Sequence, residues 1–217
     1  MFKSKMAILV GAMAVSGVAS ADLDTGLVAY WNFDDCTAKD ITGNLPDGKL
    51  SNMTCSDGVM QFNGANSYIE IPENPLLDFD SSVTFVAKIN PALNGKHHWI
   101  FRKSTCVGSP YFFGINVQDE VNLTINDVSG TWLDGASIKA GWRFVVGVYD
   151  GTSRKLYVDG AKKAEFTNVS GPIRNVNGPL YIGHPTCSGN NDFFLGEMDE
   201  LRLYNRALTA TEVKTLY

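Results

Sequence analysis

The sequence lacks several features that would point to particular classes of protein. Beyond its N-terminal segment it has no uncharged apolar run of about 18 residues, so no membrane span is expected there. It has no basic stripe. With 18 lysines and arginines against 23 aspartates and glutamates, the formal charge is −5, which argues against nucleic acid as a partner. The G-x-S-x-G, H-E-x-x-H and Walker motifs are also missing. The hydrophobic share of 44% is nevertheless typical of a globular protein.

Residues 1–21 have the layout of a secretory signal peptide. Two lysines form a positive start, an apolar run follows over residues 6–15, and residues 19–21 (ASA) supply a small-residue cleavage site. The apolar run is too short for a membrane anchor, and no basic cluster follows it. We therefore expect cleavage after Ala21 and a secreted or periplasmic protein. Its mature chain, residues 22–217, has 196 residues and a charge of −7, because the removed segment carries two lysines and no acid.

Four cysteines, an even number, lie in the mature chain: Cys36, Cys55, Cys106 and Cys187. In an oxidising compartment such a set is typical of disulfides. Of the three pairings that can be drawn, we favour Cys36 with Cys55 across a short turn-rich loop, and Cys106 with Cys187 between distant segments. A four-thiolate zinc site is the alternative, but the C-x₂-C spacing of zinc knuckles is absent.

Short runs of alternating apolar and polar residues, bounded by turn residues, recur along the whole mature chain. Such runs are typical of strands. They predict strands at 26–33, 59–62, 68–71, 83–89, 98–101, 111–117, 142–149, 156–158, 180–182 and 195–204. Without alternating helices or a linker, this pattern favours an all-β sandwich or barrel in one domain, residues 22–217.

Two turns and one helix have specific local signals. Asp159-Gly160 predicts a type I′ hairpin, because both central positions of that turn need a positive φ. Residues 63–66 (NGAN) predict a hairpin-like turn between the runs at 59–62 and 68–71. Thr209, with Glu212 three residues later, forms a capping box that predicts a helix over 210–216.

Four segments stand out in order along the chain: residues 26–34 (GLVAYWNFD), 62–71 (FNGANSYIEI), 148–160 (VYDGTSRKLYVDG) and 196–208 (GEMDELRLYNRAL). Together they resemble the laminin-G-like and pentraxin-like domains of the concanavalin A-like lectin/glucanase group. The resemblance covers essentially all of residues 22–217. It implies a jelly roll of two antiparallel sheets with the first and last strands adjacent. Members of the group often bind calcium and glycans, and some are adhesion or oligomerisation modules.

The same resemblance implies a structural calcium ion. Carried over residue by residue, it points to Asp40, the carbonyl region of Gly43, and Asp199 as ligands, because calcium takes carboxylate and carbonyl oxygens. The alternative is that Asp40 forms a turn and Asp199 caps a strand end. A pentraxin-style pair of bridging ions is not expected, since residues 184–192 contain one carboxylate.

Enzymatic hydrolysis of glycans is the weaker interpretation of the fold. Laminarinase-type hydrolases of this group use carboxylates that alternate on one strand. Here Glu197 and Asp199 share a face, but Glu200 is expected to point to the other one, and Leu201 stands where a third carboxylate would be needed. We therefore expect no enzyme.

A carbohydrate-binding rim is the leading functional expectation. If Cys106 pairs with Cys187, the loops that carry them gather at one rim the polar and aromatic side chains that bind sugars. Trp132, in a turn-rich connection, is either an exposed sugar platform or a lid on the core. The candidate carbohydrate-binding residues are Trp132, Arg102, Tyr111, Asn191 and Asp192.

The expected function is an exported, non-catalytic lectin-like module that binds a glycan or polysaccharide. The first alternative is an adhesion module that binds a cell-surface or matrix protein. The second is a glycan-cleaving enzyme of the same fold. An exposed aromatic rim would favour the first interpretation, a flat apolar patch the adhesion module, and paired carboxylates in a cleft the enzyme.

Overall fold

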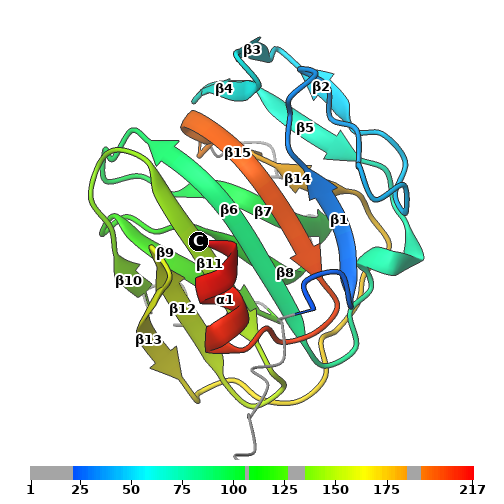
Figure 1. Ribbon diagram of the computed structural model, residues 1–217, viewed down its shortest axis with the longest axis vertical. Helices are drawn as coiled ribbons and strands as arrows, with labels where there is room; N and C mark the ends of the chain where they lie inside the picture. The colour runs from blue at the N-terminus through cyan, green and yellow to red at the C-terminus, as the bar shows by residue number, and fades with distance from the viewer. Residues whose placement is uncertain (1–21, 106–107, 127–134, 185–191) are drawn as a thin grey trace, which may run out of the picture.

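The computed structural model describes residues 22–105, 108–126, 135–184 and 192–217. Two antiparallel sheets lie face to face in it (Figure 1). The eight-stranded sheet has the order β13 (Ala161–Phe166), β12 (Arg154–Val158), β11 (Arg143–Tyr149), β6 (Val83–Pro91), β15 (Leu195–Tyr204), β4 (Val59–Asn63) and β3 (Thr54–Ser56), and β1 (Leu27–Trp31) also pairs with β15. The seven-stranded sheet has the order β10 (Gly135–Ser137), β9 (Glu120–Ile125), β8 (Gly108–Ile115), β7 (His98–Thr105), β14 (Leu180–Ile182), β5 (Tyr68–Ile71) and β2 (Lys49–Ser51). This arrangement confirms the predicted sandwich, including the adjacent first and last strands.

The main core lies between the two sheets and is built around aromatic rings. Phe85 of β6 packs against Phe101 of β7 and Phe113 of β8, with ring centroids 5.7 Å and 5.9 Å apart, and Trp31 of β1 also contacts Phe101. Gly147 of β11 leaves room for this packing, because a Cβ there would lie 2.8 Å from the Phe113 ring. Because the core is closely packed, the two sheets hold each other in place, and the side chains on their outer faces keep fixed positions.

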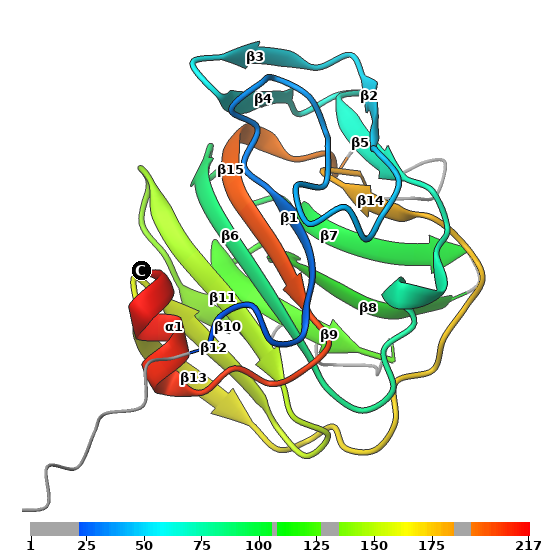
Figure 2. The same ribbon diagram turned by 45° about the vertical axis from the view of Figure 1, so that its right-hand side comes forward.

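A second, smaller apolar layer covers the outer face of the eight-stranded sheet. Helix α1 (Ala210–Leu216) lies on this face (Figures 1 and 2). Its Val213 is fully buried in one cluster with Val86 of β6, Val146 of β11 and Tyr157 of β12. A seven-residue helix is too short to be stable alone, so this packing holds it in place. The helix covers only part of the sheet and leaves the neighbouring part open.

The predicted helix and its cap are confirmed. The Thr209 hydroxyl accepts the Glu212 backbone N–H, and the Glu212 carboxylate accepts the Thr209 backbone N–H at 2.7 Å. The hairpin at Asp159-Gly160 is confirmed as well, since these residues have φ values of 51° and 72° and join the paired strands β12 and β13.

The predicted hairpin at residues 63–66 is wrong. β4 pairs with β3 and β15, whereas β5 pairs with β2 and β14, so the turn carries the chain from one sheet to the other. The Asn63 side-chain oxygen accepts N–H groups of Ala65, Asn66 and Ser67, which bends the chain out of the sheet plane without strand pairing.

The Cys36–Cys55 disulfide is confirmed and ties the loop after β1 to the edge strand β3. Cys106 and Cys187 lie outside the described residues. In the part of the chain that is described, no helix is long and apolar enough to cross a membrane.

Candidate functional site

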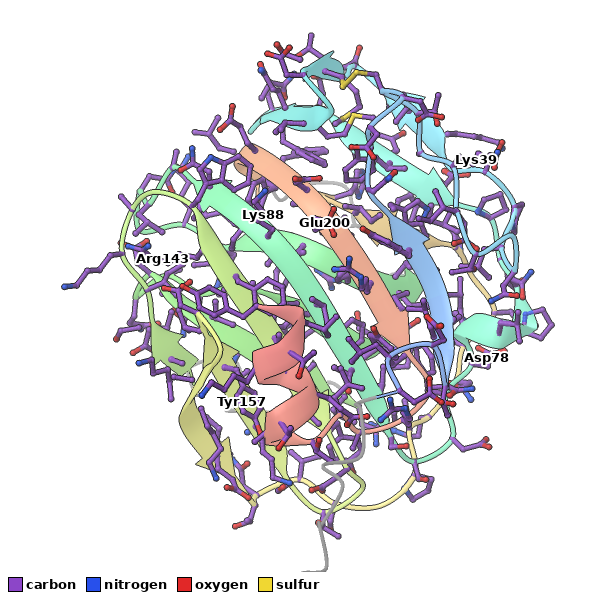
Figure 3. The ribbon with its side chains drawn as sticks, in the orientation of Figure 1. Lys39, Asp78, Lys88, Arg143, Tyr157 and Glu200 are labelled. Atoms are coloured by element: carbon purple, nitrogen blue, oxygen red, sulfur yellow. A yellow bond between two sulfur atoms is a disulfide. The ribbon has the colours of Figure 1, made fainter. Side chains whose placement is uncertain are left out.

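A groove of about 450 Å³ lies beside α1 on the outer face of the eight-stranded sheet. We call it the helix groove. Side chains of β6, β11 and β15 form its base, and Lys88, Phe144, Glu200 and Arg202 are among them. Trp142 and Arg143, the Asp159 turn and the last helical residues border it. Figure 3 shows Lys88, Glu200 and Arg143 on this face of the sheet. The volume lies within the range of roughly 300–1,000 Å³ that is typical of small-ligand sites.

An irregularity in β15 brings an acidic side chain, Glu200, into the groove. The register of β15 with β6 shifts between Asp199 and Arg202, and Glu200 has a φ of 54°. The extra residue turns Glu200 to the same outer face as Arg202, while Leu201 stays fully buried in the core. The expectation that Glu200 points to the opposite face from Asp199 is therefore wrong, because strict alternation does not hold across a bulge.

Glu200 is fixed by two donors. Its Oε2 accepts hydrogen bonds from the Tyr30 hydroxyl at 2.6 Å and from the Arg202 guanidinium, which stacks over the Tyr30 ring with 3.9 Å to the centroid. Burial, together with the hydrogen bond to Glu200, raises the pKa of Tyr30 to about 12. Tyr30 therefore remains a neutral donor at physiological pH, and the three side chains form one rigid unit.

The other two cations of the groove are also paired. Lys88 donates to Asp199 Oδ2 at 3.0 Å and lies 5.2 Å from the centre of the Trp142 ring. Arg143 lies 3.8 Å from Asp159 Oδ2 and donates to the backbone oxygens of Trp142 and Ala140. The groove therefore offers hydrogen-bonding groups that are held in ion pairs.

Two aromatic rings at the groove keep large exposed surfaces. Trp142 is 37% exposed and Tyr217 is 67% exposed. Tyr217 follows the last turn of α1 and packs on Phe144, with ring centroids 5.9 Å apart. It also lies directly on Gly160, where a Cβ would be 2.9 Å from the ring, so the glycine both forms the hairpin and makes space for the tyrosine. The groove therefore combines two exposed aromatic rings with the paired charged side chains of its base.

Two of the predicted sugar-binding residues lie on the opposite sheet, close to a common neighbour. Arg102 is 9% exposed and stacks on Trp99, 4.7 Å from the ring centroid. Burial lowers the pKa of His97; the nearby Asp192 carboxylate opposes this shift and Arg102 adds to it. Arg102 and Asp192 thus both lie near His97, Arg102 nearly buried within β7 and Asp192 half-buried.

Tyr111 is wrong as a sugar contact. It is fully buried in the core, where its hydroxyl donates to the Leu77 backbone oxygen at 3.0 Å. Strand β8 begins at Gly108, so Tyr111 stands inside the strand and faces the core with Phe113. Trp132 and Asn191 lie outside the described residues.

The residues predicted to bind calcium have other partners. The Asp40 carboxylate accepts hydrogen bonds from the backbone N–H groups of Tyr30, Thr42, Asn44 and Leu45 and from the Thr42 hydroxyl. These donors use both carboxylate oxygens, which suits the structural turn that is the alternative to a calcium ligand.

Gly43 and Asp199 add no further support for a shared ion. Gly43 donates its N–H to the Asp40 backbone oxygen within the same turn, and Asp199 pairs with Lys88. Among the described residues, no group of three or more His, Cys, Asp and Glu side chains could hold a metal ion. We assign no ion to this set, and structural calcium in the protein stays a prediction.

Sequence reasoning missed most of the helix groove, because its residues come from five separate segments. One signal was available: Trp142-Arg143 directly follows Gly141 at the start of a predicted strand, a position where a large aromatic residue is often only partly covered. Nothing in the local sequence indicates that the last residues of the chain fold back onto this strand.

Comparisons with known proteins agree with this fold. The family model described as the concanavalin A-like lectin/glucanases superfamily matches residues 63–214. A comparison with curated protein sequences finds no match.

Similar solved structures include domain 4 of AbnA, a GH43 extracellular arabinanase from Geobacillus stearothermophilus, in complex with arabinotriose. It has a TM-score of 0.69 at 22% identity, over 88% of this chain and 97% of that one. Trypanosoma rangeli sialidase has a TM-score of 0.64 at 17% identity, over 88% of this chain and 32% of that one. The binding domain of Paraclostridial Mosquitocidal Protein 1 has a TM-score of 0.65 at 21% identity, over 88% of this chain and 51% of that one. At these identities the likeness concerns the fold. With the family model covering well over half of its length, the chain belongs to the concanavalin A-like lectin/glucanase superfamily.

Proposed function

We propose that the protein is an exported, non-catalytic glycan-binding module whose binding site is the helix groove. The observation that carries this proposal is the pair of exposed rings, Trp142 and Tyr217, beside a base of fixed donors and acceptors. The C–H face of a sugar ring packs on an aromatic ring, while its hydroxyls need donors and acceptors in fixed directions. The arabinotriose bound to domain 4 of AbnA supports glycan binding by a domain of this fold.

The geometry of the β15 carboxylates supports a non-catalytic role. Glycoside hydrolysis needs one carboxyl group that donates a proton and a second that attacks or activates water. Glu197 accepts a hydrogen bond from the Asn90 amide at 2.8 Å, Asp199 accepts one from Lys88, and Glu200 accepts from Arg202. All three carboxylates are thus engaged with side-chain donors of the protein, which supports a structural or binding role for them.

Export is part of the same proposal. The signal-like residues 1–21 and the Cys36–Cys55 disulfide support it, because disulfides persist in oxidising compartments. In such a compartment an exported module would meet extracellular polysaccharide.

The test is a glycan array followed by isothermal titration calorimetry with the best oligosaccharide. Replacing Trp142 with alanine should weaken binding about thirtyfold, because loss of a central aromatic contact costs about 2 kcal/mol. Leu76→Ala is the matched control: Leu76 is 47% exposed but lies at the 3₁₀ turn η1 (Pro75–Leu77), outside the groove. Equal affinities of Trp142→Ala and the unmodified protein would refute the site. Release of reducing ends from the bound glycan would refute the non-catalytic role.

A further inference from the structure

We infer that the helix groove selects uncharged glycans over acidic ones, an inference that rests on the proposed function. The structural basis is the pairing of every charged side chain that lines the groove within the described residues. Lys88 pairs with Asp199, Arg143 with Asp159, and Arg202 with Glu200. An acidic sugar is normally held by a free guanidinium or ammonium group, and the groove leaves none without a carboxylate partner.

The remaining donors of these cations are also partly used. Arg143 donates from both terminal nitrogens to backbone oxygens, at 2.9 Å and 3.2 Å. The Arg202 guanidinium lies over the Tyr30 ring, 3.9 Å from its centroid, and the Arg202 side chain is 14% exposed. A sugar carboxylate could therefore approach Arg143 or Arg202 only by displacing Asp159 or Glu200, and the displaced carboxylate would then repel it. The Lys88 side chain is 44% exposed, but Asp199 lies 3.0 Å from its ammonium group and would repel a second carboxylate there.

The charge of the whole protein acts in the same direction. Its formal charge is −5, so an acidic polymer meets net repulsion as it approaches. A neutral glycan is not affected. Its hydroxyls can donate to the outer lone pairs of Asp159 and Glu200 and accept from Lys88 and Arg143 without breaking an ion pair. Ion pairs used in this way act as polar surfaces of zero net charge.

Asp159 gives a direct way to change this selectivity. Its Oδ1 accepts the Phe144 backbone N–H at 3.1 Å, and only its Oδ2 faces Arg143. Asparagine keeps the Oδ1 acceptor and tolerates the positive φ of this turn position, so Asp159→Asn should fold and leave Arg143 without its carboxylate. Glu70→Gln is the matched control. It removes the carboxylate of a pair with the same N–O distance, 3.8 Å to Lys49, on the seven-stranded sheet.

The experiment measures the binding of neutral arabinotriose, xylotriose and galactotriose, and of acidic trigalacturonate and sialyllactose, to the unmodified protein and both variants. We expect the best neutral probe to bind the unmodified protein at least about tenfold more tightly than either acidic probe. Asp159→Asn should raise the acidic-to-neutral affinity ratio about tenfold, the size of one charge-assisted hydrogen bond, and Glu70→Gln should not change it.

The outcomes distinguish a failure of the selectivity from a failure of the glycan-binding function. Tight binding of an acidic probe by the unmodified protein overturns the selectivity and leaves the glycan-binding function intact. An unchanged ratio in Asp159→Asn, or an equal rise in Glu70→Gln, overturns the role given to the paired Arg143. Absence of binding to all five probes, with none on the wider array, overturns the proposed function and the inference with it.

Discussion

Replacing Asp40 with alanine should destabilise the fold by about 4 kcal/mol. The carboxylate is 2% exposed and accepts the backbone N–H groups of Tyr30 and Leu45 at 2.9 Å each. Tyr30 belongs to β1 and Leu45 is buried, so water cannot readily replace the carboxylate at these two positions. Each buried donor left without a partner costs about 1–3 kcal/mol, and the donors of Thr42 and Asn44, closer to solvent, add less. For a domain of this size the loss corresponds to a decrease in Tm of about 12 °C.

Thermal and urea unfolding of Asp40→Ala, each in calcium and in chelator, measure this loss. Asp35→Ala is the matched control, because Asp35 lies in the same loop but is exposed, and its carboxylate accepts from the exposed Thr37. The loss should be the same with and without calcium, since protein donors occupy the Asp40 oxygens. A loss confined to the calcium samples would refute the reasoning, because it would make Asp40 an ion ligand. A loss no larger than that of Asp35→Ala would refute the estimate from buried donors.

Two further predictions concern stability. The hydrogen bond from Arg206 lowers the pKa of Glu212 from its ordinary 4.5 to about 2. The ionised carboxylate therefore stabilises the folded state above pH 4.5, and this stabilisation is lost as the pH falls towards 2. Glu212→Gln keeps the capping box but cannot ionise. Urea unfolding should therefore show the variant less stable at pH 7 and equal to the unmodified protein near pH 2, and a pH-independent difference would contradict the ion-pair account. Replacing both Cys36 and Cys55 with serine opens a loop with a sequence separation of 19 and should cost about 3 kcal/mol in the same assay, with glycan binding unchanged.

The parts of the fold that depend on residues close together in the sequence could be predicted from it. The capping box of Thr209 and Glu212 and the Asp159-Gly160 hairpin are local, because their hydrogen bonds or φ values involve residues a few positions apart. Short, polar edge strands were missed for the opposite reason. β2, β3 and β13 bury little apolar surface, so their sequences carry no alternating pattern, and only pairing with a neighbour makes them strands.

The helix groove could not be predicted, because two of its determinants are not local. The bulge at Glu200 depends on the pairing of β15 with β6 and β1, which no segment specifies alone. The position of Tyr217 depends on α1 docking onto β11 and β12.

The position of Tyr111, in contrast, could have been predicted from the sequence. Its alternation with Phe113 and Ile115 already indicates a core-facing side chain, and the rim assignment gave too much weight to the nearby cysteine.

The pairing of β1 with β15 also determines how the domain would respond to mechanical load. Leu27, at the start of β1, lies opposite Tyr204, at the end of β15, so the two chain ends leave this strand pair at the same end. Once tension between the ends has pulled α1 off the sheet, it would therefore open the pair one hydrogen bond at a time from Leu27 towards Trp31, instead of shearing all its bonds together. β15 would remain held by β6 and β4 while β1 peels away. Bonds broken one after another give way at a lower force than the same bonds loaded together, so this strand pair is a mechanically weak point of the domain.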